Sequence, residues 1–207
     1  MKVLLMNGSS HTKGCTYTAL SEVATVLAQE GIETEILQIG GLPVRDCIGC
    51  GQCAGKDACI FGDDVVNEWI EKAKAADGFV FGTPVYYAHP SGQLLSVLNR
   101  IFYAGGSAFT HKPGAAVASA RRAGTTASID VLNKYFTINQ MPIVSSTYWN
   151  MVHGNSPEDV KQDLEGLQTM RNLGRNMAWM LKCIEAGKAA GIEIPVAERE
   201  NRTNFIH

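Results

Sequence analysis

Four cysteines within thirteen residues are the strongest chemical signal in this chain of 207 residues. They follow the spacing C-x2-C-x2-C-x5-C, at Cys47, Cys50, Cys53 and Cys59. The first residues, MKVLLMNGSS, are too short an apolar run for a secretion signal, so cytoplasmic localisation is expected. Cytosolic thiols stay reduced, and clustered thiols in that setting usually bind metal or do redox chemistry.

Three thiols within seven residues can wrap an iron–sulfur cubane, with Cys59 closing the fourth corner. Gly49, Gly51 and Gly55 let the backbone approach the sulfur atoms. The spacing is near the bacterial ferredoxin run C-x2-C-x2-C-x3-C-P, but the fourth gap is longer and Ile60 replaces the proline. A four-thiolate zinc site and a redox-thiol segment without metal remain alternatives.

A second candidate site is the hydroxyl-rich loop NGSSHTKGCT at residues 7–16, between the first expected strand and helix. Backbone N–H groups at a helix start favour an anion, and Gly14 allows close approach. The loop is neither G-x-G-x-x-G nor a Walker loop, because Lys13 and Gly14 stand in the inverted order. Such a loop predicts a mononucleotide phosphate site; the alternative is a capped helix after a plain turn.

Two further loops are expected at the same edge of the sheet, TPVYYAHP at 83–90 and SARRAGTT at 119–126. Tyr86 and Tyr87 can flank a flat heterocycle, and the amides of Val85 and Tyr86 can bond its polar edge. Arg121 and Arg122 can stabilise negative charge on a reduced ring or meet a second nucleotide's phosphate. Solvated surface arginines are the alternative.

Three other residues have assignable chemistry. Cys15 lies at a helix start, which lowers a thiol pKa, but a small residue whose backbone binds phosphate is the favoured interpretation. Asn150 and His153, in the aromatic loop after the fifth expected strand, can orient a substrate or nicotinamide, or pack at a subunit interface.

The elements that must position these residues alternate between strand and helix. Strands are expected at 2–6, 32–39, 78–82, 115–120 and 141–145. Helices are expected at 16–29, 65–76, 91–103 and 124–136, and a last helix at 157–190 with a kink near Gly174. Such alternation predicts an α/β fold with a parallel sheet covered by helices on both faces. Ligands bind such sheets at the carboxyl ends of the strands.

At this point the chain resembles the NADPH-dependent FMN reductase group of flavodoxin-like proteins, and within it the iron-sulfur flavoprotein branch. The resemblance is carried by residues 7–16, 47–59, 82–93 and 119–126. It implies a flavodoxin-like three-layer sandwich with a five-stranded parallel sheet of order 2-1-3-4-5. It also implies one FMN-binding domain over 1–191, with a cysteine-rich insert at 47–59 and a C-terminal tail at 192–207.

The resemblance also implies which residues hold the cofactors. The FMN phosphate would be surrounded by Ser9, His11, Gly14, Cys15 and Thr16, although His11 stands where an arginine is often found. The isoalloxazine would be bordered by Pro84, Val85, Tyr86, Tyr87, Ser119, Arg121 and Gly124. A [4Fe-4S] cluster would be held by Cys47, Cys50, Cys53 and Cys59.

The expected function is that of an FMN-dependent oxidoreductase or electron-transfer flavoprotein that relays electrons between FMN and the cluster. The donor would be NAD(P)H or reduced ferredoxin, and the acceptor a small molecule or a redox protein. One alternative is an NAD(P)H-dependent FMN or quinone reductase without a cluster. Another is a non-enzymatic flavodoxin-type electron carrier. A homodimer or homotetramer is expected from the resemblance, because it can bring the cluster of one chain to the flavin of another.

Composition excludes several other classes. Lys plus Arg is 18 and Asp plus Glu is 20, a net charge of -2, so no basic excess points to nucleic acid. No apolar run reaches the roughly 18 residues of a membrane span. A hydrophobic content of 45% with 18% charged residues indicates a globular chain rather than a disordered one.

Overall fold

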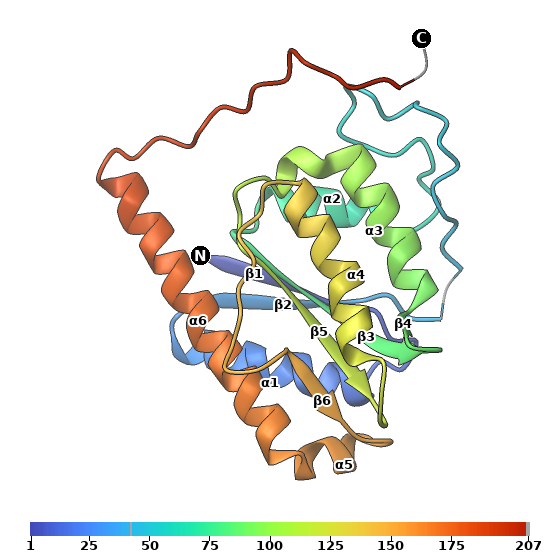
Figure 1. Ribbon diagram of the computed structural model, residues 1–207, viewed down its shortest axis with the longest axis vertical. Helices are drawn as coiled ribbons and strands as arrows, with labels where there is room; N and C mark the ends of the chain where they lie inside the picture. The colour runs from blue at the N-terminus through green and yellow to red at the C-terminus, as the bar shows by residue number, and fades with distance from the viewer. Residues whose placement is uncertain (42, 206–207) are drawn as a thin grey trace.

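The computed structural model describes residues 1–41 and 43–205, and its described part contains a parallel sheet between two layers of helices (Figure 1). The parallel strands are β1 (Lys2–Asn7), β2 (Glu33–Gln38), β3 (Gly78–Tyr86), β5 (Gly114–Ala120) and β6 (Met151–His153). Their order β2-β1-β3-β5-β6 confirms the predicted order 2-1-3-4-5 of five parallel strands. A sixth strand, β4 (His89–Pro90), pairs antiparallel with the end of β3 and was not predicted.

The helices cover the two faces of the sheet. The structure has α1 (Cys15–Gln29), α2 (Val66–Lys74), α3 (Gly92–Gly105), α4 (Thr125–Ile138), α5 (Pro157–Gln162), α6 (Leu164–Ala189) and a 3-10 turn at Gly106–Ala108. One face of the sheet packs on α1 and α6, and the other on α2, α3 and α4 (Figure 1).

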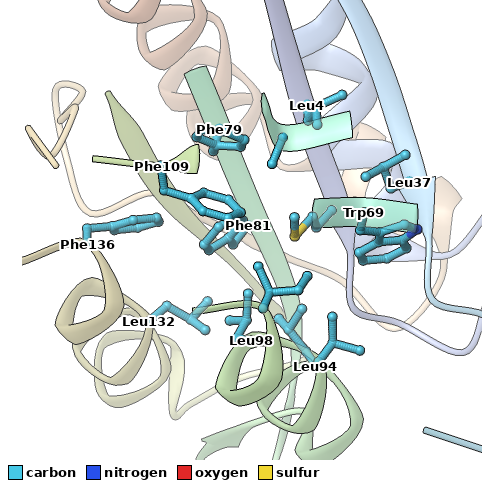
Figure 2. Packing of buried hydrophobic residues seen from close by; sticks show 14 of the residues in the cluster. Leu4, Leu37, Trp69, Phe79, Phe81, Leu94, Leu98, Phe109, Leu132 and Phe136 are labelled. Atoms are coloured by element: carbon cyan, nitrogen blue, oxygen red, sulfur yellow. The ribbon is translucent and has the colours of Figure 1, made fainter. Parts of the chain in front are cut away.

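Alternation along the strands divides the core into two clusters. In β1, Val3 and Leu5 face α1 and α6, whereas Leu4 and Met6 face the opposite helices. Side chains on both faces are fully buried, which explains why the strand is a continuous apolar run. Figure 2 shows the cluster that contains Leu4. In it the ring of Phe79 packs with that of Phe109, and the ring of Phe81 packs with that of Phe136 of α4.

The predicted strand at 141–145 is wrong. That segment makes only an isolated bridge, between Gly114 and Ile143, and the fifth parallel strand is β6. The β6 residues pair with the end of β5, from Ala118 opposite Met151 to Ala120 opposite His153. The segment at 141–145 contains a proline, which has no N–H for the ladder, and both segments are short and apolar.

The last predicted helix is two helices. Ser156 caps α5 in a capping box with Asp159, and Pro157 is its first residue, as predicted. The chain then breaks at Asp163, whose side chain accepts from the backbone N–H of Gly166 at 2.9 Å and so caps α6. The helix α6 continues through Gly174. A β-carbon at Gly174 would lie 2.9 Å from that of Val26, so the glycine lets α1 and α6 approach closely.

The described residues after α6 form neither helix nor strand. Residues 190–205 are exposed, and Figure 1 shows them crossing the molecule toward the cysteine segment. Arg199 lines a shallow cavity there together with Cys53 and Tyr103. Among residues 1–41 and 43–205, no helix has the length and apolar character needed to span a membrane.

Candidate functional site

The carboxyl edge of the sheet is held together by side chains at the ends of β1 and β2. The Asn7 side chain donates to Gln38 Oε1 at 2.6 Å and accepts from the Ser9 backbone N–H at 3.2 Å. Gln38 Nε2 in turn donates to the Ser9 carbonyl at 2.7 Å. These bonds fix the path of the chain as it leaves β1, so the first polar loop starts in one defined geometry.

The first loop leaves the start of α1 open. Buried Ser9 accepts from the His11 backbone N–H at 3.1 Å, while the His11 side chain is exposed. Gly14 precedes α1, and no side chain caps the helix. A β-carbon on Gly14 would lie 2.9 Å from that of His11, so this close turn needs a glycine. The first backbone N–H groups of α1 therefore remain available for an anion.

Thr16 joins this loop to the end of β5. Its hydroxyl lies 2.8 Å from that of Ser119, and both residues are buried. Beside it, the Cys15 thiol donates to the Gly154 carbonyl at 3.6 Å, after β6. Burial raises the pKa of the Cys15 thiol, so the expected lowering by the helix start is wrong. The structure thus brings the loops after β1, β5 and β6 together.

The loop predicted after the third strand is itself mostly strand. β3 continues to Tyr86, and Pro84 pairs with Ser119 of β5. Tyr87 and Ala88 form a two-residue turn with φ of 51° and 58°, the geometry of a tight hairpin. The chain then returns as β4, where the Thr83 hydroxyl accepts from the Ser91 backbone N–H at 2.9 Å. The expected residues are present at the sheet edge, but on a hairpin.

The tip of this hairpin packs against the start of α4. Gly124 has φ +93°, and a β-carbon there would lie 2.5 Å from Ala88 Cα. Tyr86 is half exposed and Tyr87 fully exposed at the tip. Arg121 and Arg122 are exposed in the turn between β5 and α4. Hairpin, turn and arginines therefore form one rim of the sheet edge.

The four cysteines of the insert line a single cavity of about 530 Å³. Residues 43–65 have no helix or strand, and all four thiols are free. Gly49 and Gly51, on either side of Cys50, adopt φ of 65° and 68°, which glycine allows without strain. Four thiols around one cavity suit a metal that prefers sulfur ligands. Within the described ranges, however, no three His, Cys, Asp or Glu side chains are already arranged as a metal site.

Side chains of α2 and α3 hold both ends of the cysteine segment. Asn67 of α2 accepts from the Cys59 backbone N–H at 2.7 Å and donates to the Cys59 carbonyl at 2.9 Å. Asp46 accepts from the Cys47 backbone N–H at 2.7 Å and from Asn99 of α3 at 2.9 Å. The segment is therefore anchored to one helical layer by polar bonds.

Several residues that build these sites were missed from the sequence. They are Asn7 and Gln38 at the sheet edge, and Asn67, Asn99, Arg100 and Asp64 around the cysteines. Of these residues, only Asn7 had a signal in the sequence that pointed to a site, because it is the first residue of the polar loop at 7–16. Asn150 and His153, expected in a loop after the fifth strand, lie just before β6 and at its end. Asn150 Oδ1 accepts from the Ser146 hydroxyl at 2.7 Å, and the His153 backbone N–H donates to Asp163 at 2.7 Å.

Comparison with known proteins agrees with this arrangement. Residues 1–156 match the family model for NADPH-dependent FMN reductase. An iron-sulfur flavoprotein of Methanocaldococcus jannaschii is 35% identical over 193 residues, covering 89% of this chain and 100% of the relative. An iron-sulfur flavoprotein of Methanosarcina thermophila is 28% identical over 194 residues, covering 91% and 99%.

The fold has a solved counterpart. A flavodoxin from the domain Archaea superposes with a TM-score of 0.61 at 11% identity, over 88% of this chain and 99% of the flavodoxin. At that identity the likeness shows the fold alone, a flavodoxin-like α/β sandwich. Sequence and fold together place the protein: the chain belongs to the NADPH-dependent FMN reductase family of flavin-dependent oxidoreductases, in its iron-sulfur flavoprotein branch.

Proposed function

We propose that this protein relays electrons between FMN at the carboxyl edge of the sheet and a [4Fe-4S] cluster at the four cysteines. The observation that carries the proposal is the single cavity lined by all four thiols, on a chain whose sheet edge gathers three polar loops. In this assignment residues 1–191 form one domain, the insert at 47–59 carries the cluster, and residues 192–207 are a tail.

The phosphate of FMN would lie at the start of α1. The N–H groups at Cys15 and Thr16 favour an anion there, because no side chain caps the helix start. Ser9 and His11 would add hydrogen-bond donors at the same end of the helix. These residues bind and orient the cofactor and exclude water from one side of it.

The flavin ring would lie along the rim made by the β3–β4 hairpin and the turn after β5. Residues 84–87 and 119–124 offer backbone amides for its polar edge and the ring of Tyr86 for its flat face. Arg121, exposed on this rim, would place a positive charge near the ring, where reduction builds negative charge. When bound, FMN supplies two-electron and one-electron chemistry, which lets it exchange electrons with a one-electron centre.

The cysteines would supply four thiolate ligands to the cluster. The donor would be NAD(P)H or reduced ferredoxin, and the acceptor a small molecule or a redox protein. Tyr103, which is 76% exposed, lines the cysteine cavity and is available to a redox partner or to a second copy in a homodimer or homotetramer. We assign the protein to the cytoplasm, where thiols stay reduced.

A second candidate is an NAD(P)H-dependent FMN or quinone reductase without a cluster. It is favoured by one observation: the cysteine side chains in the described part of the chain do not form a ready-made metal site. The cysteine segment would then only pack against α2 and α3. The relay requires bound iron and the simple reductase does not, whereas both require FMN.

The deciding experiment is purification without oxygen, followed by a visible spectrum and assays for iron, sulfide and zinc. The relay requires bound flavin together with about four iron and four sulfide per chain. Flavin without iron would favour the simple reductase, and zinc would make the cysteine segment structural. Protein that binds no FMN even when the cofactor is added would contradict both candidates.

The contact between Thr16 and Ser119 yields a prediction on FMN affinity. Replacing Thr16 by valine keeps the shape but leaves the buried Ser119 hydroxyl without its partner, a loss of about 1–3 kcal/mol. Because Thr16 lies at the proposed phosphate site, loss of the contact also lets this site move, so we expect the dissociation constant for FMN, measured by fluorescence titration of apoprotein, to rise roughly tenfold. Thr25→Val is the matched control, because Thr25 lies on the same helix and its hydroxyl donates to the Ser21 carbonyl, away from β5. Equal affinity in both variants would rule out a role of this contact.

A further inference from the structure

Arg100 is a buried cation beside the cysteine cavity. It lies on α3, and its side chain is 1% exposed. Arginine is rarely buried to this extent unless it is fully paired, because taking the charge out of water is costly. The groups around Arg100 must therefore stabilise its charge.

The hydrogen-bond partners of the Arg100 guanidinium lie within residues 45–64, in the last residues of the cysteine insert and on both of its flanks. The two terminal nitrogens donate to the carboxylate of Asp64, to the Phe61 carbonyl at 3.0 Å and to the Arg45 carbonyl at 3.3 Å. Nε, the remaining donor, points to Cys59 Sγ at 3.3 Å. One side chain of α3 thus binds the segment at several points and reaches one of the four thiols directly.

The guanidinium keeps its charge in this position. A guanidinium stays protonated at ordinary pH, and here it donates to the buried carboxylate of Asp64. Asp64 is nearly as buried, with 7% of its side chain exposed. The pair is neutral overall, so the field at Cys59 comes from the short N–H···S contact more than from net charge.

We propose that Arg100 is a positioning residue that holds Cys59 at the cavity and makes the cluster at the four cysteines easier to reduce. The inference rests on the proposed function, since it concerns the same cluster. Adding one electron makes a thiolate-ligated cluster more negative, and no bond breaks. Hydrogen bonds to its sulfur atoms favour that more negative state, which is why they are among the determinants of cluster potentials.

Two substitutions separate the hydrogen bond from the net charge. Asp64→Asn removes the negative member of the pair and keeps Arg100, so the region becomes more positive. The double variant Asp64→Asn with Arg100→Met removes both charges together, so it deletes the N–H···S bond without changing the net charge. A surface pair on the other face, Arg171 with Glu22 at 2.6 Å, gives the matched control Glu22→Gln with Arg171→Met.

The test is an anaerobic reductive titration of each holoprotein with dithionite, followed by electron paramagnetic resonance of the cluster. We expect the midpoint potential of the cluster to be highest in Asp64→Asn, intermediate in wild type and lowest in the double variant. The double variant should show a roughly tenfold smaller equilibrium constant for uptake of the electron, which is about 59 mV for a one-electron couple. The surface control should match wild type. Circular dichroism on the same samples checks that each variant folds.

A purely structural role of Arg100 gives a different result. A wild-type potential in the double variant would overturn the inference while leaving the relay intact. If the double variant takes up no cluster, Arg100→Lys replaces it, because lysine keeps the positive charge and lacks the Nε donor, and a wild-type potential in Arg100→Lys overturns the inference. Wild-type protein that holds FMN but no iron and sulfide would overturn the cluster assignment itself and the inference with it.

Discussion

Replacing Cys50 by serine is expected to remove nearly all iron and acid-labile sulfide from the protein while leaving FMN bound. Cys50 is the exposed thiol of the four, and the left-handed Gly49 and Gly51 on either side present it at the tip of the loop. The three remaining thiols cannot complete a four-thiolate site, and a serine hydroxyl is a poor ligand for this cluster. The proposed FMN loops start at the carboxyl edge of the sheet, whereas this tip is part of a segment held by α2 and α3.

The measurement is iron and sulfide per flavin after anaerobic reconstitution, with the visible spectrum of the same sample. Cys183→Ser is the matched control, because Cys183 is also exposed but lies on α6, outside the segment at 47–59. The control should keep wild-type iron content. A full complement of iron in Cys50→Ser would remove Cys50 from the ligand set, and loss of flavin along with iron would show that the two sites depend on each other.

Replacing Gly124 by alanine is expected to destabilise the protein and to abolish tight FMN binding. The left-handed φ of +93° alone costs a residue with a β-carbon roughly 1–2 kcal/mol. The added methyl group would also lie 2.5 Å from Ala88 Cα, so the β3–β4 hairpin must move away from the start of α4. Because hairpin and turn together form the proposed flavin rim, that movement widens the site.

Gly31→Ala isolates the conformational part of this effect. Gly31 has a similar φ of +78°, but a β-carbon there meets nothing within 4 Å. Free energies of unfolding from urea titrations should therefore fall in both variants and fall further in Gly124→Ala. FMN affinity should fall only in Gly124→Ala. Equal unfolding free energies of the two variants would show that the hairpin accommodates the methyl group. A destabilised Gly124→Ala variant with wild-type FMN affinity would show that the rim is not the flavin site.

The sheet order and the meeting of the polar loops at one edge were predictable because the signals were local. Strands such as β1 and β3 are continuous apolar runs, and helix starts carry recognisable caps, as at Ser91, whose side chain accepts from the Leu94 N–H. In a parallel sheet the carboxyl ends of all strands lie along one edge. Thr16, after β1, therefore lies at the same edge as Ser119 of β5, although β3 lies between the two strands.

The errors and omissions concern features that depend on distant contacts. The segment at 141–145 and β6 are both short and apolar, and only pairing with Ala118 to Ala120 decides between them. The break between α5 and α6 falls at Asp163, without the proline or glycine that would mark it. Arg100 stands in an apolar helix sequence where its burial depends on Asp64 and Phe61, which lie at least 36 residues away.

The anchoring of the cysteine segment bears on how the protein responds to oxidative damage. The segment is attached to α2 and α3 by side chains such as Asn67 and Asn99, and it contributes no strand to the sheet. The loops at the start of α1 and the end of β5 are instead part of the sheet edge. Opening of the segment breaks polar bonds and the packing of Val44, Cys53 and Cys59 on one helical layer, but no strand pairing. We therefore expect the segment to open at a free energy below that of global unfolding, which exposes oxidised thiols for reduction while the sheet stays folded.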